Sequence, residues 1–192
     1  MTPRSLIVCA LPIMLALSGC GRPTAPGPEE TTRVQEAGRA ATKAVVESLG
    51  SQLKAAIQSG GPVAAIAVCQ QVALPLTDAA RSGLPDVVAV RRTTLRPRNP
   101  QNAPDPLDRI VLERLAATQP LPEELIEWPA EGPARFYKPL VIQEVCLNCH
   151  GDPAGFPPPL TEALAGRYPE DQATGYAIGD LRGVIRVDVA RP

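Results

Sequence analysis

The sequence predicts a mixed α/β domain of the α+β kind, in which helices come first and a small antiparallel sheet follows. Three observations predict it. Apolar residues recur at three- and four-residue spacing from Thr31 to Ser59, as in a long amphipathic helix. Valine-rich runs at 87–90 and 183–189 read as strands. The 23 prolines, many of them in two loops and a linker, indicate a loop-rich domain rather than a plain helix bundle.

Residues 1–19 are predicted to be a lipoprotein signal peptide. A cation at Arg4 precedes the apolar run Leu6–Leu17, which is too short to span a membrane comfortably. The run ends in Leu17-Ser18-Gly19-Cys20, which resembles the bacterial lipobox, where cleavage precedes the cysteine and its thiol is lipidated. The alternative is an ordinary secretory signal with an incidental cysteine.

We therefore expect an exported protein, held on the periplasmic side of a bacterial membrane by a lipid on Cys20. Residues 20–30 combine this cysteine with a proline-rich, extended tether, and residues 31–192 form the folded domain. Three thiols then remain in the folded part, an odd number that needs an explanation in an exported protein.

The helical pattern of Thr31–Ser59 is interrupted at Gly60-Gly61, and Pro62 opens a second helix that runs to about Ser82 and that Pro75 is expected to kink. The periodicity and turn residues then predict the other elements. These are a strand at Asp86–Thr94, a loop at Leu95–Pro106, a helix at Leu107–Ala117, a strand at Arg135–Val145, a loop at Cys146–Pro159 and a strand at Gly183–Val189.

Charge and composition narrow the function. The net charge is −1 and no Lys/Arg stripe alternates with aromatic residues, which argues against a nucleic-acid partner. Aromatic residues are only 3%, few for a core of this size. A bound porphyrin would supply much of the missing flat apolar bulk.

The motif Cys146-Leu147-Asn148-Cys149-His150 is C-x-x-C-H, the attachment site of one covalent haem c. One helical turn presents both thiols to the porphyrin vinyl groups and the imidazole to the iron. A thioredoxin-like site would need a helix after the motif, but Gly151-Asp152-Pro153 follows. A zinc site would need another ligand pair, and there is no second C-x-x-C and no second histidine.

The sequence leaves several candidates for the sixth iron ligand. His150 is the only histidine, and both methionines, Met1 and Met14, lie in the leader. Cys69 is the leftover thiol and lies on an apolar helix face; it is either an iron ligand or a small buried hydrophobe. The other candidates are Lys43, Lys54, Lys138, a tyrosine, the acylated terminus, or no ligand at all.

Cationic and amide side chains after the first strand suit the two haem propionates. The candidates are Arg92, Arg96, Arg98, Asn99 and Asn102. The alternative is a solvated loop held by turns and prolines. The segment Tyr168–Gly183 either closes over the haem edge or only provides the turn before the last strand.

From about Ala64 to Val189 the chain resembles a family of exported single-haem-c domains with a PAS-like fold, which occur alone or as sensor modules of histidine kinases and chemoreceptors. The matching residues are Val68-Cys69, Arg92-Thr93, Arg98-Asn99-Pro100, Asn102, Pro104-Asp105, Pro139, Cys146 to Gly151, Tyr168-Pro169, Asp171, Ala173, Gly175-Tyr176, Gly179-Asp180 and Gly183. The resemblance implies iron ligation by His150 and Cys69. One departure is Thr94, where the family has serine.

These observations predict a redox- or gas-responsive sensor, in which CO or NO can bind the ferrous haem and an unidentified redox or signalling protein is the partner. The alternative is a low-potential electron-transfer cytochrome c. We do not expect an enzyme, because a haem peroxidase needs a distal histidine base and His150 has no second histidine beside it.

Overall fold

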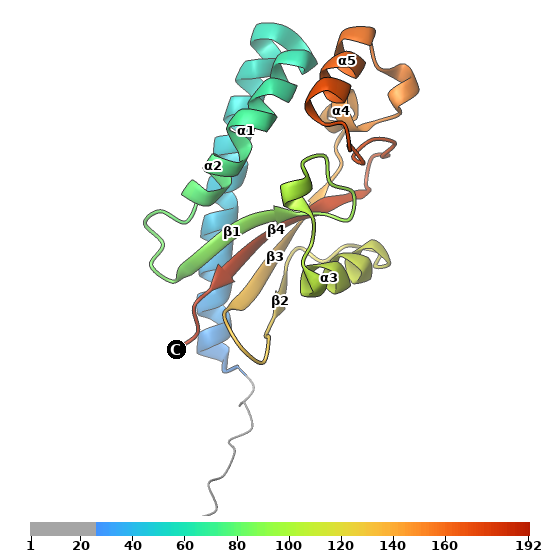
Figure 1. Cartoon of the computed structure of the whole chain (residues 1–192). Helices are drawn as coiled ribbons and strands as arrows, with labels where there is room; N and C mark the ends of the chain where they lie inside the picture. Colours follow the sequence, from blue (N-terminus) through green and yellow to red (C-terminus); the bar gives the residue numbers. More distant parts are fainter. Residues whose placement is uncertain (1–25) are drawn as a thin grey trace, which may run out of the picture.

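The computed structural model describes residues 26–192, and its centre is a four-stranded antiparallel sheet of order β1-β4-β3-β2 (Figure 1). The helices are α1 (Pro28–Gln71), α2 (Ala73–Ala79), α3 (Pro106–Ala116), α4 (Leu147–His150) and α5 (Pro158–Arg167). The strands are β1 (Val87–Thr93), β2 (Leu125–Glu127), β3 (Ala134–Val141) and β4 (Leu181–Val189). Three short 3₁₀ turns cover Pro100–Asn102, Glu144–Cys146 and Pro153–Gly155. The expected helix-first α+β architecture, with a long N-terminal helix and a PAS-like antiparallel sheet, is confirmed.

Different helices pack on the two faces of the sheet. On one face, Val34, Ala41 and Val45 of α1 pack against Phe136 and other strand residues. On the other face, α3 packs its Val111, Leu112 and Leu115 against Tyr137 and Val184. The last strand therefore contributes to both cores: Ile185 and Val187 lie in the first and Val184 in the second, and β4 is one of the two inner strands of the sheet.

The predicted alternation of β4 is confirmed, but its polar row is buried as well as its apolar row. Arg186 donates to Asp105 at 2.8 Å and to Asp108 at 2.9 Å, and it also pairs with Asp188. Asp105 caps the N-terminus of α3 by accepting from the Asp108 N–H. This ion cluster fastens α3 to the sheet.

The predicted break in the first helix is confirmed. Gly60 and Gly61 have non-helical dihedrals, and Gly61 adopts a φ of 68° that favours glycine. The second predicted helix, however, does not run unbroken to Ser82, because the chain bends by 53° at Val72 between α1 and α2. Pro75 explains the bend, since it has no N–H to donate to the preceding turn.

Two predicted boundaries are wrong. The proposed tether ends too late, because α1 already begins at Pro28, where proline and the acidic Glu29 and Glu30 suit a first helical turn. The strand expected at Arg135–Val145 ends at Val141, where the chain bends into the turn before the C-x-x-C-H motif.

Two elements were not predicted at all. Strand β2 has only three residues, too few for a periodic pattern. Helix α5 begins inside a run of three prolines that reads as loop, although proline is well tolerated in the first helical turn.

The signal peptide and Cys20 lie outside the described residues. Within residues 26–192 no single helix has both the length and the apolarity to cross a membrane, although the bent pair of α1 and α2 meets that test by length and composition.

The upper end of the molecule in Figure 1 gathers segments that are far apart in sequence. There the second half of α1 lies beside α4 and α5, beyond the end of the sheet. Ile66 of α1 packs with Leu160, Leu164 and Tyr168, and Cys149 and Phe156 lie against this cluster. The C-x-x-C-H motif and Cys69 are therefore brought to the same region.

Candidate functional site

The C-x-x-C-H motif forms a single helical turn. Cys146 ends the 3₁₀ turn, α4 spans Leu147–His150, and Gly151 terminates it by donating its N–H to the Leu147 carbonyl. A Cβ at Gly151 would lie 2.7 Å from the Leu147 carbonyl oxygen, so the chain can turn this sharply only with glycine. Cys146 and Cys149 are free thiols, and both are half-buried.

Cys69 and the C-x-x-C-H motif line one cavity of about 160 Å³. Its wall is otherwise mostly apolar. The lining residues are Leu53, Ile57, Pro62, Ala65, Ile66, Cys69, Arg98, Val145, Cys146, Asn148, Cys149 and His150. Of the candidates for a sixth ligand that fall within residues 26–192, only Cys69 belongs to this lining; neither a lysine nor a tyrosine does. Lys43 lies on the exposed side of α1, paired with Glu47.

His150 is held in one tautomer and orientation. Its Nδ1 lies 2.7 Å from the Ala173 carbonyl oxygen, to which it donates, so that Nε2 keeps its lone pair for a metal. Burial, followed by the positive charges of Arg182 and Arg98, lowers the pKa of His150 to about 3. The imidazole is therefore neutral at physiological pH, which is the form that ligates iron.

The loop 171–176 holds the motif in place from the other side. The N–H groups of Gly175 and Tyr176 donate to the carbonyls of Gly151 and His150 at 2.6 and 2.9 Å. The Tyr176 ring meets the His150 ring edge-on, with 6.2 Å between centroids. Part of the segment that the sequence left open thus positions the histidine through backbone hydrogen bonds.

Arg98 ties this loop to the motif. Its Nε donates to Asp171 at 2.9 Å, and its Nη2 donates to the carbonyls of Cys149 and Ala173 at 2.5 and 3.2 Å. Asp171 in turn accepts from the Ala173 N–H at 2.8 Å. Arg98 lines the cavity, but most of its guanidinium is occupied by these partners.

Cys69 lies near the end of α1 and is half-buried. Burial raises the pKa of its thiol, and the nearby charge of Arg92 opposes this rise. The Cys69 thiol therefore lies at the cavity wall in half-buried surroundings with cations nearby.

The other side chains predicted to bind the haem propionates lie in different surroundings. Arg92 on β1 is largely buried, and its Nε has no hydrogen-bond partner among the described residues. Asn99 is not part of the cavity; its side chain accepts from the Gln101 N–H and caps the 3₁₀ turn. Arg96 is exposed and donates to the carbonyls of Gln172 and Thr174.

Arg182 was missed by sequence reasoning. It precedes Gly183 on β4, and nothing in the local pattern distinguishes it from a solvent-facing strand residue. In the fold it bonds Thr94, whose hydroxyl donates to the Arg182 carbonyl at 2.7 Å. Threonine keeps the hydroxyl that the family's serine has, so this departure leaves the contact intact.

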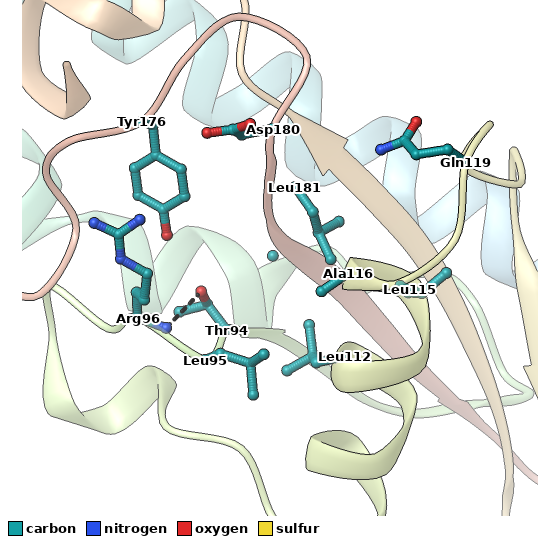
Figure 2. A pocket seen from close by; sticks show the side chains of 11 residues that line it. Thr94, Leu95, Arg96, Leu112, Leu115, Ala116, Gln119, Tyr176, Asp180 and Leu181 are labelled. Carbon is teal, nitrogen blue, oxygen red and sulfur yellow. Dashed lines mark hydrogen bonds between the residues drawn. The ribbon is translucent and has the colours of Figure 1, made fainter.

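A second cavity of about 260 Å³ lies behind Tyr176, between α3 and the start of β4 (Figure 2). Figure 2 shows Arg96 next to the Tyr176 ring, over which its guanidinium stacks at 4.1 Å, with Leu112 and Leu115 of α3 across the cavity. Tyr176 thus separates this cavity from His150.

The comparison with family models decides the relationship. The model of the Tll0287-like family matches residues 29–190, nearly the whole described chain. The chain belongs to the Tll0287-like family. Among solved structures, it is similar to the crystal structure of the cyanobacterial haem-protein Tll0287, with 26% identity and a TM-score of 0.58 over 87% of this chain and 98% of that chain. A comparison with curated proteins finds no match. The resemblance and the PAS-like fold expected from the sequence are confirmed.

Proposed function

We propose that this Tll0287-like protein is a membrane-anchored monohaem c-type cytochrome with His/Cys axial ligation, which acts as a redox- or gas-responsive sensor. The observation that carries the proposal is that Cys69, Cys146, Cys149 and His150 line one mostly apolar cavity. The similarity to a haem protein over 87% of the chain supports the choice of cofactor.

The residues present fit a haem. Cys146, at the end of the 3₁₀ turn, and Cys149 in α4 are three residues apart on one continuous turn, as thioether bonds to one macrocycle require. His150 Nε2 is free to bind iron, because Nδ1 is engaged by Ala173. When bound, the haem supplies an iron that changes between ferric and ferrous states and that binds small gases once an axial position is vacant.

Cys69 is the proposed sixth ligand. It is the only one of the sixth-ligand candidates within residues 26–192 that lines the cavity with His150. As a thiolate it is an anionic donor, which favours the ferric state and lowers the midpoint potential.

The position of Cys69 supports a sensor. It lies on the part of α1 between the Gly60-Gly61 break and the bend at Val72. This segment contacts α5 through Ile66 and continues through α2 into β1. Release of the thiolate on reduction would free the segment to move, and such a movement is what a signalling partner could read. No catalytic turnover is proposed.

The first test is the attachment of the haem. Acid–acetone extraction of the purified protein should leave the colour with the polypeptide, because thioether bonds survive this treatment. A haem that extracts would disprove the covalent c-type assignment.

The second test is Cys69→Ala. We expect covalent haem to remain and the low-spin ferric spectrum and EPR signal to become high-spin or water-ligated. Gln70→Ala is the matched control, since this neighbouring side chain is exposed and bonds Arg167 instead of lining the cavity. An unchanged spectrum of Cys69→Ala would show that another group holds the sixth position.

Sensor and electron carrier are separated by the ferrous state. A sensor should lose Cys69 on reduction and bind CO or NO. A ferrous haem that does not bind CO would exclude the sensor proposal. A positive, pH-independent midpoint potential would exclude a low-potential carrier as well. The two results together would leave an ordinary electron-transfer cytochrome.

A further inference from the structure

The region around Cys69 and His150 has an excess of positive charge on buried and half-buried side chains. Three arginines approach it: Arg92 from β1, Arg98 from the following loop and Arg182 from β4. Arg98 is 7% exposed and is neutralised by Asp171, at 2.9 Å. Neither Arg92 nor Arg182 forms an ion pair with any carboxylate within residues 26–192.

Of the two, Arg92 has the less satisfied guanidinium. It pairs in register with Ile185, whose side chain lies in the core under α1, so Arg92 points to the same face as α1. Its Nε is buried and without a hydrogen-bond partner among the described residues. A buried cation without an anion or acceptor is costly, and burial accordingly lowers the pKa of Arg92.

Arg182 is satisfied only by neutral groups. Its Nη1 donates to Thr94 Oγ1 at 3.1 Å and to the Arg96 carbonyl at 3.3 Å, and its guanidinium lies 5.6 Å from the Tyr176 ring centroid. Burial lowers the pKa of Arg182, the Tyr176 and Asp171 side chains oppose this shift, and repulsion from Arg98 and Arg92 adds to it.

Contacts connect both arginines to the candidate ligands. Arg182 bonds Thr94, two residues after Arg92, and its guanidinium lies 5.6 Å from the centroid of the Tyr176 ring, which meets the His150 ring edge-on. Among the cations, Arg92 acts most strongly on Cys69, and Arg182 acts most strongly on His150. Both propionates leave a porphyrin along one edge, and two carboxylates are what two unpaired guanidinium groups require.

We propose that Arg92 and Arg182 bind the two haem propionates, one each, whereas Arg98 holds the 171–176 loop. This inference rests on the proposed function, because it presumes a haem in the cavity. It also assigns the charge balance of the site: Asp171, a Cys69 thiolate and two propionates would neutralise the three arginines and the ferric porphyrin centre.

The test is the midpoint potential of the covalent holoprotein in Arg92→Gln and Arg182→Gln. Loss of a cation disfavours the added electron, so each variant should change the ferric-to-ferrous ratio at fixed potential about tenfold toward ferric, a lowering of about 59 mV for one electron. Resonance Raman bands of the propionate groups should shift in the same variants. Arg39→Gln is the matched control, because this arginine is 62% exposed and pairs with Glu124 away from the cavity, and it should change neither readout.

The lysine variants separate propionate binding from a structural role. Arg92→Lys and Arg182→Lys keep the charge but lose the bidentate fork, so the propionate bands should shift while the potential stays near that of the wild type. They also decide the question if a glutamine variant does not fold. Unchanged propionate bands in both lysine variants would overturn the inference.

A soluble anion is the rival occupant of the arginine pair. The midpoint potential should then vary with phosphate concentration at constant ionic strength, and this dependence should vanish in the glutamine variants; that outcome would also overturn the inference. Covalent haem with unaffected potentials refutes the arginine assignment alone. A wild-type protein without covalent haem refutes the proposed function itself.

Discussion

Replacing Arg98 by leucine tests whether the 171–176 loop is held as the structure shows. The side chain is 7% exposed and binds Asp171 and two backbone carbonyls, those of Cys149 and Ala173. Leucine fills similar space but leaves the Asp171 carboxylate, itself 11% exposed, without its cation. The Cys149 carbonyl loses a donor at the same time.

Breaking a buried ion pair by removing one partner costs about 3–5 kcal/mol. Asp171 keeps its bond from the Ala173 N–H, and the Ala173 carbonyl keeps its bond from His150, which limits the loss to that range. For a domain of this size each kcal/mol lowers Tm by about 2–4 °C, so Arg98→Leu should lower Tm by roughly 6–20 °C.

Thermal unfolding followed by circular dichroism measures the loss. Arg39→Leu is the control, because Arg39 also pairs with a carboxylate, Glu124, but is 62% exposed, and exposed pairs contribute little. The double variant with Asp171→Asn should be more stable than Arg98→Leu alone, since no buried charge is then left unpaired. Equal losses in Arg98→Leu and Arg39→Leu would refute the argument that the buried pair fastens the loop.

Three further predictions follow from the site and the sequence. Cys20→Ser should release the protein from membranes or leave its leader uncleaved, as judged by fractionation and mass spectrometry; a wild-type protein found wholly soluble with an unmodified N-terminus would contradict the lipobox. The midpoint potential should be negative and fall with rising pH by up to about 59 mV per unit, if the Cys69 sulfur takes up a proton on reduction; a redox titration at several pH values measures this, and a flat profile would contradict it. Burial alone would raise the pKa of Asp105, but hydrogen bonds from Arg135 and from the Asp108 N–H lower it to about 2. Because the folded-state pKa of Asp105 lies below its ordinary value of 3.8, the ionised carboxylate stabilises the fold above about pH 4, and this stabilisation is lost as the pH falls toward 2. Asp105→Asn should therefore reduce the loss of stability between about pH 4 and pH 2 in a curve of unfolding free energy against pH. An unchanged acid side of that curve would show that other carboxyl groups dominate it.

Much of the candidate site could be predicted because it depends on short-range spacing. The C-x-x-C-H motif needs only one helical turn, and α4 is that turn. Cys69 could be proposed because histidine and methionine were eliminated by counting. The Gly60-Gly61 break and the kink before Pro75 were equally local, since glycine and proline change the backbone wherever they occur.

The elements that were missed lack a local pattern. Strand β2 exists because three residues reach β3 at the edge of the sheet. Arg186 and Asp188 look like a solvent-facing row, but α3 covers them and supplies Asp108 as a partner. Burial of a polar residue depends on what packs on it, which its own sequence neighbours do not record.

The chemistry available to this protein follows from its sequence: which thiols and which imidazole exist, and how the turn from Cys146 to His150 spaces three of the four groups. The tertiary structure alone decided their surroundings. The carbonyl of Ala173 reaches His150, Arg98 reaches Asp171, and Arg92 and Arg182 approach from two strands, all across long stretches of chain. Spacing along a helix is dictated by bond geometry. The long-range contacts, by contrast, form only when the sheet is complete and α1 and α5 pack around the cavity. They are therefore a property of the whole domain, which folds cooperatively.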